Sequence, residues 1–371
     1  MHDININDSN NNVNIAKKRI RELDLARGYS ILFVIATHVD LFKGIVFKTL
    51  FYNFAVPFFF FASAFSLTLK YGTKEKINLK EFYKNRFHYY LIAYFIYAFI
   101  IHFIQNLQDF HYSFNAFIVY YLTNTLLGNV QTIWFLYVLF YFYLIYPFFL
   151  KFLGRKRDST VLLFLGVLIL IITVIYSNPY LFGLLCRSII LNEFSVDNYT
   201  IPINITKCFL ILFMIPFFLL GYLFARNYVK IKNFISKKKI FYITTIAYFI
   251  FVLFLFINQD FIEANFYHLD SASTYYSWVN LFYSLFTIIF LLTFFIKFNK
   301  SRFFYFNGKH SANLFLLQRP VILILRPFNI GNYFTVYFFC LLLIFTEKKI
   351  TKFFKTKITL TSALPDTFTS S

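Results

Sequence analysis

The sequence predicts an all-α, polytopic integral membrane protein with about ten transmembrane helices and both termini in the cytoplasm. The composition, the spacing of the apolar segments and the distribution of basic residues predict this fold class. Of the 371 residues, 59% are hydrophobic, 24% are aromatic and only 14% are charged. The mean hydropathy of +0.62 lies far above that of water-soluble domains. A soluble globular fold is therefore excluded.

Ten apolar segments approach the length of a bilayer-crossing helix, which is about 20 mostly apolar residues. A polar, Asn-rich tail precedes the first of them, so we do not expect a cleaved signal peptide. In order along the chain, the segments are residues 28–47, 50–69, 87–105, 132–152, 159–177, 206–225, 240–258, 277–298, 311–327 and 332–347.

These segments divide the chain into three parts. Residues 1–18 form a low-complexity tail that we expect to be disordered. Residues 19–350 form a ten-helix membrane domain, and residues 351–371 form a short cytoplasmic tail. The three Cys residues are far apart, and neither a disulfide framework nor a metal site follows from their spacing.

The basic residues set the orientation of the segments. Most of the 36 Lys and Arg residues lie in the two tails and in every second connection. The other side has only Lys43, Lys48, Arg187, Lys207 and Arg326. Cytoplasmic loops carry an excess of basic residues, so both termini are predicted to be cytoplasmic. Because the net charge of +20 comes in short clusters between apolar runs, it indicates contact with membrane lipids and argues against nucleic acid.

Ionisable residues inside the predicted segments are the first functional candidates, because they are costly to place in lipid. They are Arg27, His38, Asp40, His102 and Arg319. Eleven positions separate Arg27 from His38, so both lie on one helix face with a rise of about 16 Å between them. Arg27 would pair with a phosphate-bearing donor at the cytosolic end, and His38 would accept a proton from a hydroxyl or act as a nucleophile. For His102, packing against a neighbouring helix is the simpler interpretation.

The first segment resembles the signature of a known family. Residues 19–28 read Arg-Ile-Arg-Glu-Leu-Asp-Leu-Ala-Arg-Gly, and ten residues separate Arg27 from His38. This pattern resembles the first membrane span of the bacterial membrane acyltransferase-3 family. Less specific similarities to later spans of the family lie at residues 57–65, 134–147, 215–222 and 307–318.

Family members are ten-span proteins with cytosolic termini that move an acyl group, usually acetyl from acetyl-CoA, onto sugars of lipopolysaccharide, exopolysaccharide or peptidoglycan. The resemblance implies an enzyme of the bacterial inner membrane with no permanently bound cofactor and no metal, which takes acyl-CoA as donor and a glycan or lipid-linked glycan as acceptor. It implies that His38 is the catalytic residue and that Arg27, Lys84 and Arg86 bind the donor. Glu22 and Asp24 match the family's acidic pair, which would orient Arg27 or stabilise the helix start.

Two departures from the family pattern affect the expected site. Where the family often has an Arg and a Pro at the entry to the third span, this chain has Tyr89 and Ala93, so the donor site would be built differently, with His88 as a candidate. Where the ninth span often carries a His, this chain has Gln318, which can hydrogen-bond but cannot titrate. Trp134 and Gln318 are supporting candidates, and helix-to-helix bonding or interfacial anchoring is their alternative interpretation.

Two other functions stay open at the level of sequence. A transporter or flippase for a polysaccharide or lipid intermediate would also have about ten spans, although the chain shows no clear internal repeat. A membrane acyltransferase of another family would also use a histidine and would differ in its acceptor. Residues 106–131 and 177–205, which are predicted outer loops rich in Tyr, Phe and Asn, would either contact sugars or form an interfacial aromatic belt.

Overall fold

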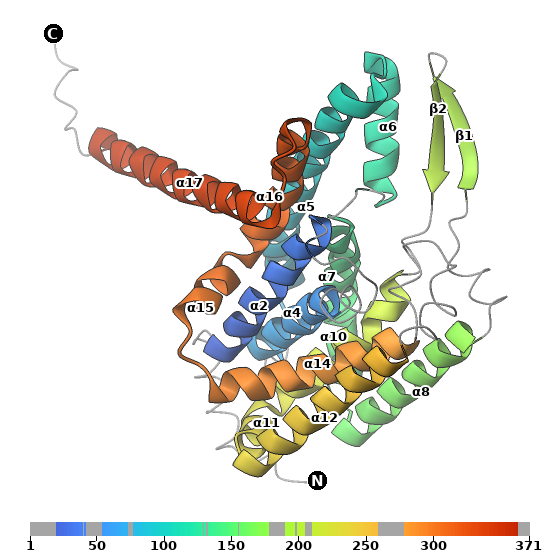
Figure 1. Cartoon of the computed structure of the whole chain (residues 1–371), viewed down its shortest axis with the longest axis vertical. Coiled ribbons are helices and arrows are strands. Elements are labelled where there is room, and N and C mark those ends of the chain that lie inside the picture. Colours follow the sequence, from blue (N-terminus) through green and yellow to red (C-terminus); the bar gives the residue numbers. More distant parts are fainter. Residues whose placement is uncertain are drawn as a thin grey trace.

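Helices make up most of the computed structural model of this chain (Figure 1). The prediction of a helical protein is therefore confirmed. The structure describes residues 20–39, 41, 54–72, 77–128, 130, 133–154, 156–177, 190–196, 199–204, 210–258 and 278–362. Asp40 and the predicted N-terminal tail up to residue 18 lie outside these ranges.

Two short irregular helical turns accompany the α-helices among the described residues. A π-helical turn, Asn106–Phe110, continues α5, and a 3₁₀ turn, Arg326–Phe328, follows α16. The α-helices are α2 (Arg21–His38), α4 (Ala55–Tyr71), α5 (Leu79–Gln105), α6 (Phe114–Leu126), α7 (Trp134–Leu153), α8 (Asp158–Ser177), α10 (Leu210–Arg226), α11 (Tyr228–Ile235), α12 (Lys238–Ile257), α14 (Trp278–Lys297), α15 (Arg302–Lys309), α16 (Ser311–Leu325) and α17 (Tyr333–Ser362).

Each of the ten predicted apolar segments overlaps a helix within the described ranges. Among the described residues, two helical stretches are long and apolar enough to cross a membrane: Tyr90–Phe110 and Trp134–Leu153. A third would cross if α10 and α11, which meet at a bend of 90°, count as one broken span. The number of crossings and the side on which the termini lie stay predictions.

A β-hairpin is present that the sequence analysis did not predict. Strands β1 (Ile190–Val196) and β2 (Tyr199–Asn204) pair antiparallel, with Val196 opposite Tyr199. The hairpin belongs to the predicted outer loop 177–205 and contacts α6, which belongs to the predicted outer loop 106–131 (Figure 1). The two segments proposed to face the acceptor therefore lie side by side.

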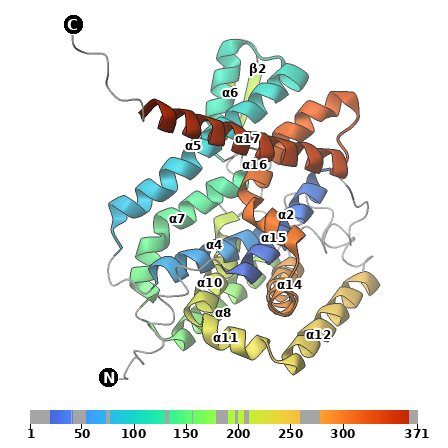
Figure 2. The ribbon, with the colours of Figure 1, turned by 90° about the vertical axis from the view of Figure 1, so that its left-hand side faces the viewer.

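Helix α4 lies at the centre of the helical packing. It contacts α2, α10 and α14 (Figure 2), and its rings at Phe58, Phe60 and Phe61 are fully buried. A helix that is apolar on all sides is expected to be surrounded by other helices or lipid. Small residues let its neighbours approach closely: a Cβ added at Gly221 of α10 would lie 2.2 Å from the carbonyl oxygen of Phe61.

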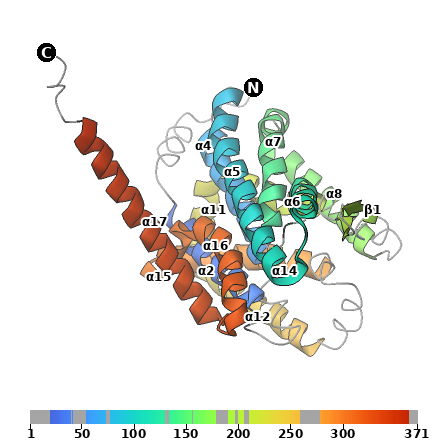
Figure 3. The same ribbon diagram turned by 90° about the horizontal axis from the view of Figure 1, so that it is seen from above.

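The outer helices are packed in two different ways. Helix α14 contacts both α12 and α8, in the lower part of Figure 1. Helix α17 packs its first turns against α16, and its later turns extend away from the other helices (Figure 3). Helices α4, α5 and α7 run next to one another in the same view, and the space among them and α16 contains the candidate site.

Candidate active site

Helices α2 and α15 cross with their backbones in contact at two glycines. A Cβ at Gly28 would lie 1.8 Å from the carbonyl oxygen of Phe304, and a Cβ at Gly308 would lie 1.7 Å from the carbonyl oxygen of Asp24. Only glycine permits this approach, because any side chain would collide with backbone atoms. The crossing brings Arg27, next to Gly28, and Lys309, next to Gly308, to the wall of one cavity.

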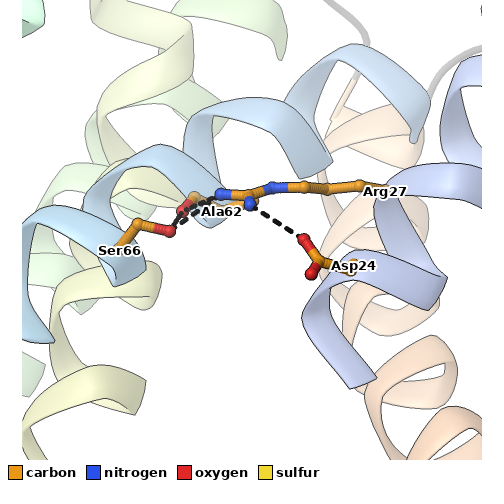
Figure 4. A network of polar contacts seen from close by, with 4 residues as sticks. All are labelled: Asp24, Arg27, Ala62 and Ser66. Atoms are coloured by element: carbon orange, nitrogen blue, oxygen red, sulfur yellow. Dashed lines mark hydrogen bonds and ion pairs between the residues drawn. The ribbon is translucent and has the colours of Figure 1, made fainter. Parts of the chain in front are cut away.

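The Arg27 side chain bridges α2 and α4 (Figure 4). Its Nη2 donates to the hydroxyl of Ser66 at 2.8 Å and to the carbonyl of Ala62 at 3.0 Å, while its Nη1 lies 3.4 Å from Oδ1 of Asp24. The Asp24 side chain is 1% exposed and that of Arg27 is 22% exposed. Asp24 therefore orients Arg27, as the sequence analysis expected, and the guanidinium is held at the edge of the cavity.

The cavity beside Arg27 has a volume of about 220 Å³ and is enclosed by α2, α4, α5, α7, α16 and the end of α15. Six of its lining residues can form hydrogen bonds through their side chains: Arg27, Ser63, Tyr90, Tyr143, Lys309 and Ser311. Apolar contact comes from Phe59, Ala93, Phe135, Leu136, Leu139, Ala312, Phe315 and Leu316. An aromatic and aliphatic cavity with a few convergent polar groups is typical of a ligand site.

The directions of the helices separate the polar lining residues from the aromatic ones. Helix α4 is antiparallel to α2, because Arg27 contacts Ser66 while Phe33, further along α2, contacts Phe54 at the start of α4. On α4, Phe59 therefore lies about 10 Å beyond Ser66 in the direction in which α2 runs away from Arg27.

Helix α7 runs parallel to α4. The hydroxyl of Tyr146 donates to Thr68 at 3.2 Å, and near the other ends of both helices the rings of Phe60 and Phe135 lie 4.9 Å apart. Tyr143 is thus at the Arg27 end of the cavity, and Phe135 is about 12 Å further along.

Helix α16 gives the same order. Gly308, just before α16, touches Asp24, and the ring of Phe315 lies 6.4 Å from that of Phe59. Ser311 is thus at the Arg27 end, and Phe315 is one turn further along. The cavity has a polar end at Arg27 and an aromatic end at Phe59, Phe135 and Phe315.

Arg86 lies beside the polar end. Its guanidinium carbon is 5.6 Å from the centre of the Tyr143 ring, a distance at which the ring face attracts a cation. Within the described part of the chain, the half-buried Nε of Arg86 has no hydrogen-bond partner. Lys84 is exposed two residues earlier on α5. Two of the three predicted donor-binding residues, Arg27 and Arg86, therefore converge on one end of the cavity.

Glu22 has partners other than Arg27. Its carboxylate accepts a hydrogen bond from Tyr228 and one from Lys232, whose Nζ lies 2.6 Å from Oε1. Burial alone would raise the pKa of Glu22, but these hydrogen bonds outweigh burial and lower that pKa below its ordinary value. Glu22 therefore ties the start of α2 to α11, and of the acidic pair only Asp24 contacts Arg27.

His38 and the two supporting candidates lie outside the cavity lining. His38 is the last residue of α2 and is partly exposed. Trp134 is the first residue of α7 and packs against the core beside the lining residue Phe135. Gln318 is fully buried on α16, and its side-chain amide has no partner among the described residues. Arg27 thus lines the polar end of the cavity and Arg86 contacts the lining residue Tyr143 there, whereas His38, Trp134 and Gln318 do not line the cavity.

Several lining residues were not individually predicted. Ser63, Lys309 and Ser311 occur in stretches that resemble family motifs, but the sequence analysis assigned them no role. Ala93, noted as a departure from the family pattern, lines the cavity and leaves space where a larger residue would fill it. The side chains of His88 and Tyr89 lie outside the described residues.

The apolar helices indicate a membrane protein, and a cavity with cationic groups at one end and aromatic rings at the other is suited to an anionic ligand with an apolar portion. A family model described as an acyltransferase domain matches residues 20–346, and the chain belongs to the acyltransferase-3 family. It is therefore a membrane acyltransferase. No curated protein and no solved structure matches the chain.

Proposed function

We propose that the protein transfers an acyl group, with acetyl as the expected case, from acyl-CoA at the cytosolic face to a hydroxyl of a cell-envelope or exported glycan. It would act as a multi-pass protein of the bacterial inner membrane. The observation that carries this proposal is the cavity whose polar end holds Arg27, Lys309 and the neighbouring Arg86 and whose other end is aromatic.

The polar end suits the phosphates of coenzyme A. Arg27, Arg86 and Lys309 supply three positive charges. The guanidinium group of an arginine can donate hydrogen bonds to two phosphate oxygens at once. Because Asp24, Ser66 and Ala62 already hold Arg27, little side-chain entropy is lost when a ligand binds. The exposed Lys84 would add attraction at the entrance.

The thin apolar arm of the donor would extend from the phosphates into the cavity. The thioester would then lie near the aromatic end, on the side of Arg27 towards which α2 runs to His38. The rise from Arg27 to His38 is about 16 Å, and helical side chains lean towards the N-terminus of their helix. The imidazole of His38 would thus lean back towards the thioester.

His38 would activate the acceptor. As the hydroxyl oxygen bonds to the thioester carbonyl carbon, His38 accepts the hydroxyl proton; the C–S bond then breaks, and the proton passes to the leaving thiolate. The products are an O-acyl ester and free coenzyme A. An imidazole is suited to this step because it exchanges a proton near neutral pH.

The acceptor would approach from the opposite side of the membrane. Helix α6 and the β1–β2 hairpin, which contact each other, come from the two predicted outer loops that are rich in Tyr, Phe and Asn. Aromatic rings and amide groups are suited to stack on sugar rings and to bond to their hydroxyls.

The test is transfer of radiolabelled acetyl from acetyl-CoA to envelope glycan in membranes that contain equal amounts of each variant. We expect His38→Ala to lower transfer at least about 100-fold, as for loss of a general base, and Arg27→Ala to raise the donor concentration needed. Arg302→Ala is the control, since this residue is exposed and lies outside both the cavity lining and the predicted outer loops.

Equal transfer by the wild type and His38→Ala would remove His38 as the base. Absence of transfer from any acyl-CoA, together with movement of a glycan or lipid intermediate across the membrane, would favour the transporter alternative.

A further inference from the structure

The aromatic end of the cavity is formed by three phenylalanines from three helices. Phe59 of α4, Phe135 of α7 and Phe315 of α16 all line the cavity. Their ring centres lie 5.8 Å apart for Phe59 and Phe135, 5.1 Å for Phe135 and Phe315, and 6.4 Å for Phe59 and Phe315. Each ring thus touches both others, and the three form one wall, which we call the phenylalanine wall.

A second layer supports the phenylalanine wall from behind. Phe60 is fully buried and packs edge-on against Phe135 at 4.9 Å, and Phe142 packs against Phe60 at 5.4 Å. A ring with packed neighbours on its far side moves only if those neighbours also move, and overpacking such a core is destabilising. The phenylalanine wall therefore sets a fixed end to the cavity.

The volume in front of the wall is small. Pockets that enclose a drug-sized ligand have about 300–1,000 Å³, whereas this cavity has about 220 Å³. That space admits a thin arm and a short group at its tip. A longer chain would have to displace rings or leave the cavity.

We propose that Phe59, Phe135 and Phe315 select the length of the transferred acyl group, restricting the donor to short-chain acyl-CoA. This inference rests on the proposed function, because it places the donor's thioester arm in the cavity. The carbonyl carbon lies in front of the wall and the alkyl end of the acyl group abuts the rings. Shortening one ring opens room for added methylenes without changing the charged groups at the polar end.

The test compares acetyl-, butyryl- and hexanoyl-CoA as donors for the purified full-length protein and a glycan acceptor. Phe315→Leu and Phe315→Val remove successively more of one ring, and Phe135→Leu provides a second site. Phe295→Leu is the matched control, because it removes the same atoms from α14 at a residue that is 1% exposed and does not line the cavity. Its ring packs against Tyr29 and Phe304, away from the phenylalanine wall.

We expect the wild type to favour acetyl. The ratio of butyryl to acetyl transfer rises at least about tenfold in the Phe315 and Phe135 variants, since one methylene in an apolar pocket is worth about 10- to 200-fold in discrimination. Hexanoyl transfer rises most in Phe315→Val, and the ratio in Phe295→Leu stays at the wild-type value.

An unchanged ratio in folded Phe315→Leu and Phe135→Leu, with an active wild type, would overturn the selection of length and leave the proposed function standing. An equal rise for all three donors would also overturn it, because the rings would then control access to the cavity and would not select the length of the acyl group. A wild type that transfers no acyl group from any of the three donors would overturn the proposed function and this inference together.

Discussion

Helix α4, which the Arg27 side chain contacts, and helices α8 and α12 are all rich in apolar residues, yet they are packed in different ways. Along α4, thirteen of the seventeen residues are buried. Along α8, Leu163 is 69% exposed and Leu170 is 63% exposed, and on α12 Ile257 is 74% exposed. In a protein surrounded by lipid, an apolar side chain gains little by moving from lipid to a helix interface. Apolarity alone therefore does not identify the functional centre.

Small residues and polar bridges distinguish the centre from the periphery. Gly28 and Gly308 allow backbone contact between α2 and α15, and Gly221 allows it between α10 and α4. Arg27 and Glu22 each bond across two helices. On α8, by contrast, a Cβ at Gly166 would meet nothing within 4 Å. The comparison predicts that stability depends on contacts at the centre and tolerates change at the periphery.

The largest effect is expected from a methyl group at the helix crossing. Gly308→Ala would place a Cβ against the backbone oxygen of Asp24, so the helices must separate, at a cost of about 3 kcal/mol or more. We expect most of the protein to be lost from the monodisperse fraction in detergent. Gly166→Ala should leave it unchanged or raise its thermal stability, because Ala favours helix. Equal yields of both variants would contradict the close crossing.

The sequence was sufficient to locate the long apolar helices because their apolar segments are long and polar connections separate them. It did not locate α6, α11 and α15, which lie in predicted connections. The first predicted membrane segment begins at residue 28, and α2 extends back from there to Arg21. Its first turn contains Glu22 and Asp24, and these acidic residues are accommodated by partners on α11 and by Arg27. The partners of Glu22 come from a distant part of the chain, so the sequence alone does not show that they meet.

The candidate site was predicted only in part for a related reason. Arg27 and Arg86 were identified from the family resemblance, and each is anchored at the cavity by contacts of its own. The phenylalanine wall could not be identified, because a chain with 58 Phe residues offers no local signal for the three that meet. Only the packing of α4, α7 and α16 selects them.

The second prediction concerns the hydrogen bond that orients the Arg27 side chain. Ser66→Ala removes the 2.8 Å hydrogen bond to its guanidinium, which is worth about 1.5–3 kcal/mol when the donor is charged. If Arg27 binds the donor, the loosened side chain should raise the apparent KM for acyl-CoA about tenfold with little change in kcat. Thr173→Ala on peripheral α8, where the hydroxyl bonds within its own helix, should leave KM unchanged. A reduced kcat at constant KM would instead indicate that Ser66 acts on the acyl-transfer step.

The third prediction concerns the tie between α2 and α11. Because the pKa of Glu22 is lowered in the folded protein, the charged carboxylate stabilises the fold above its ordinary pKa of 4.5, and this contribution is lost as the pH falls through the lowered value. Thermal unfolding in detergent should therefore show wild type and Glu22→Gln differing by a few degrees at pH 7 and converging as the pH falls below the lowered pKa of Glu22. Parallel curves over the whole range would show that Glu22 does not sense acid through this contact.

The smallest effect is expected on the exposed face of α8. Val161, Leu165 and Ile172 face inward and are at most 7% exposed, whereas Leu163 points away from the other described helices. Leu163→Ala should change the free energy of unfolding by less than about 0.5 kcal/mol, as for other exposed substitutions, because lipid or detergent takes the place of the lost methyl groups. Leu165→Ala on the inward face should cost about 2–5 kcal/mol. Thermal unfolding of the two variants in the same detergent measures this difference. Equal losses would mean that the outer face of α8 is covered by a further element or a second copy of the chain, and that the distinction between centre and periphery does not hold there.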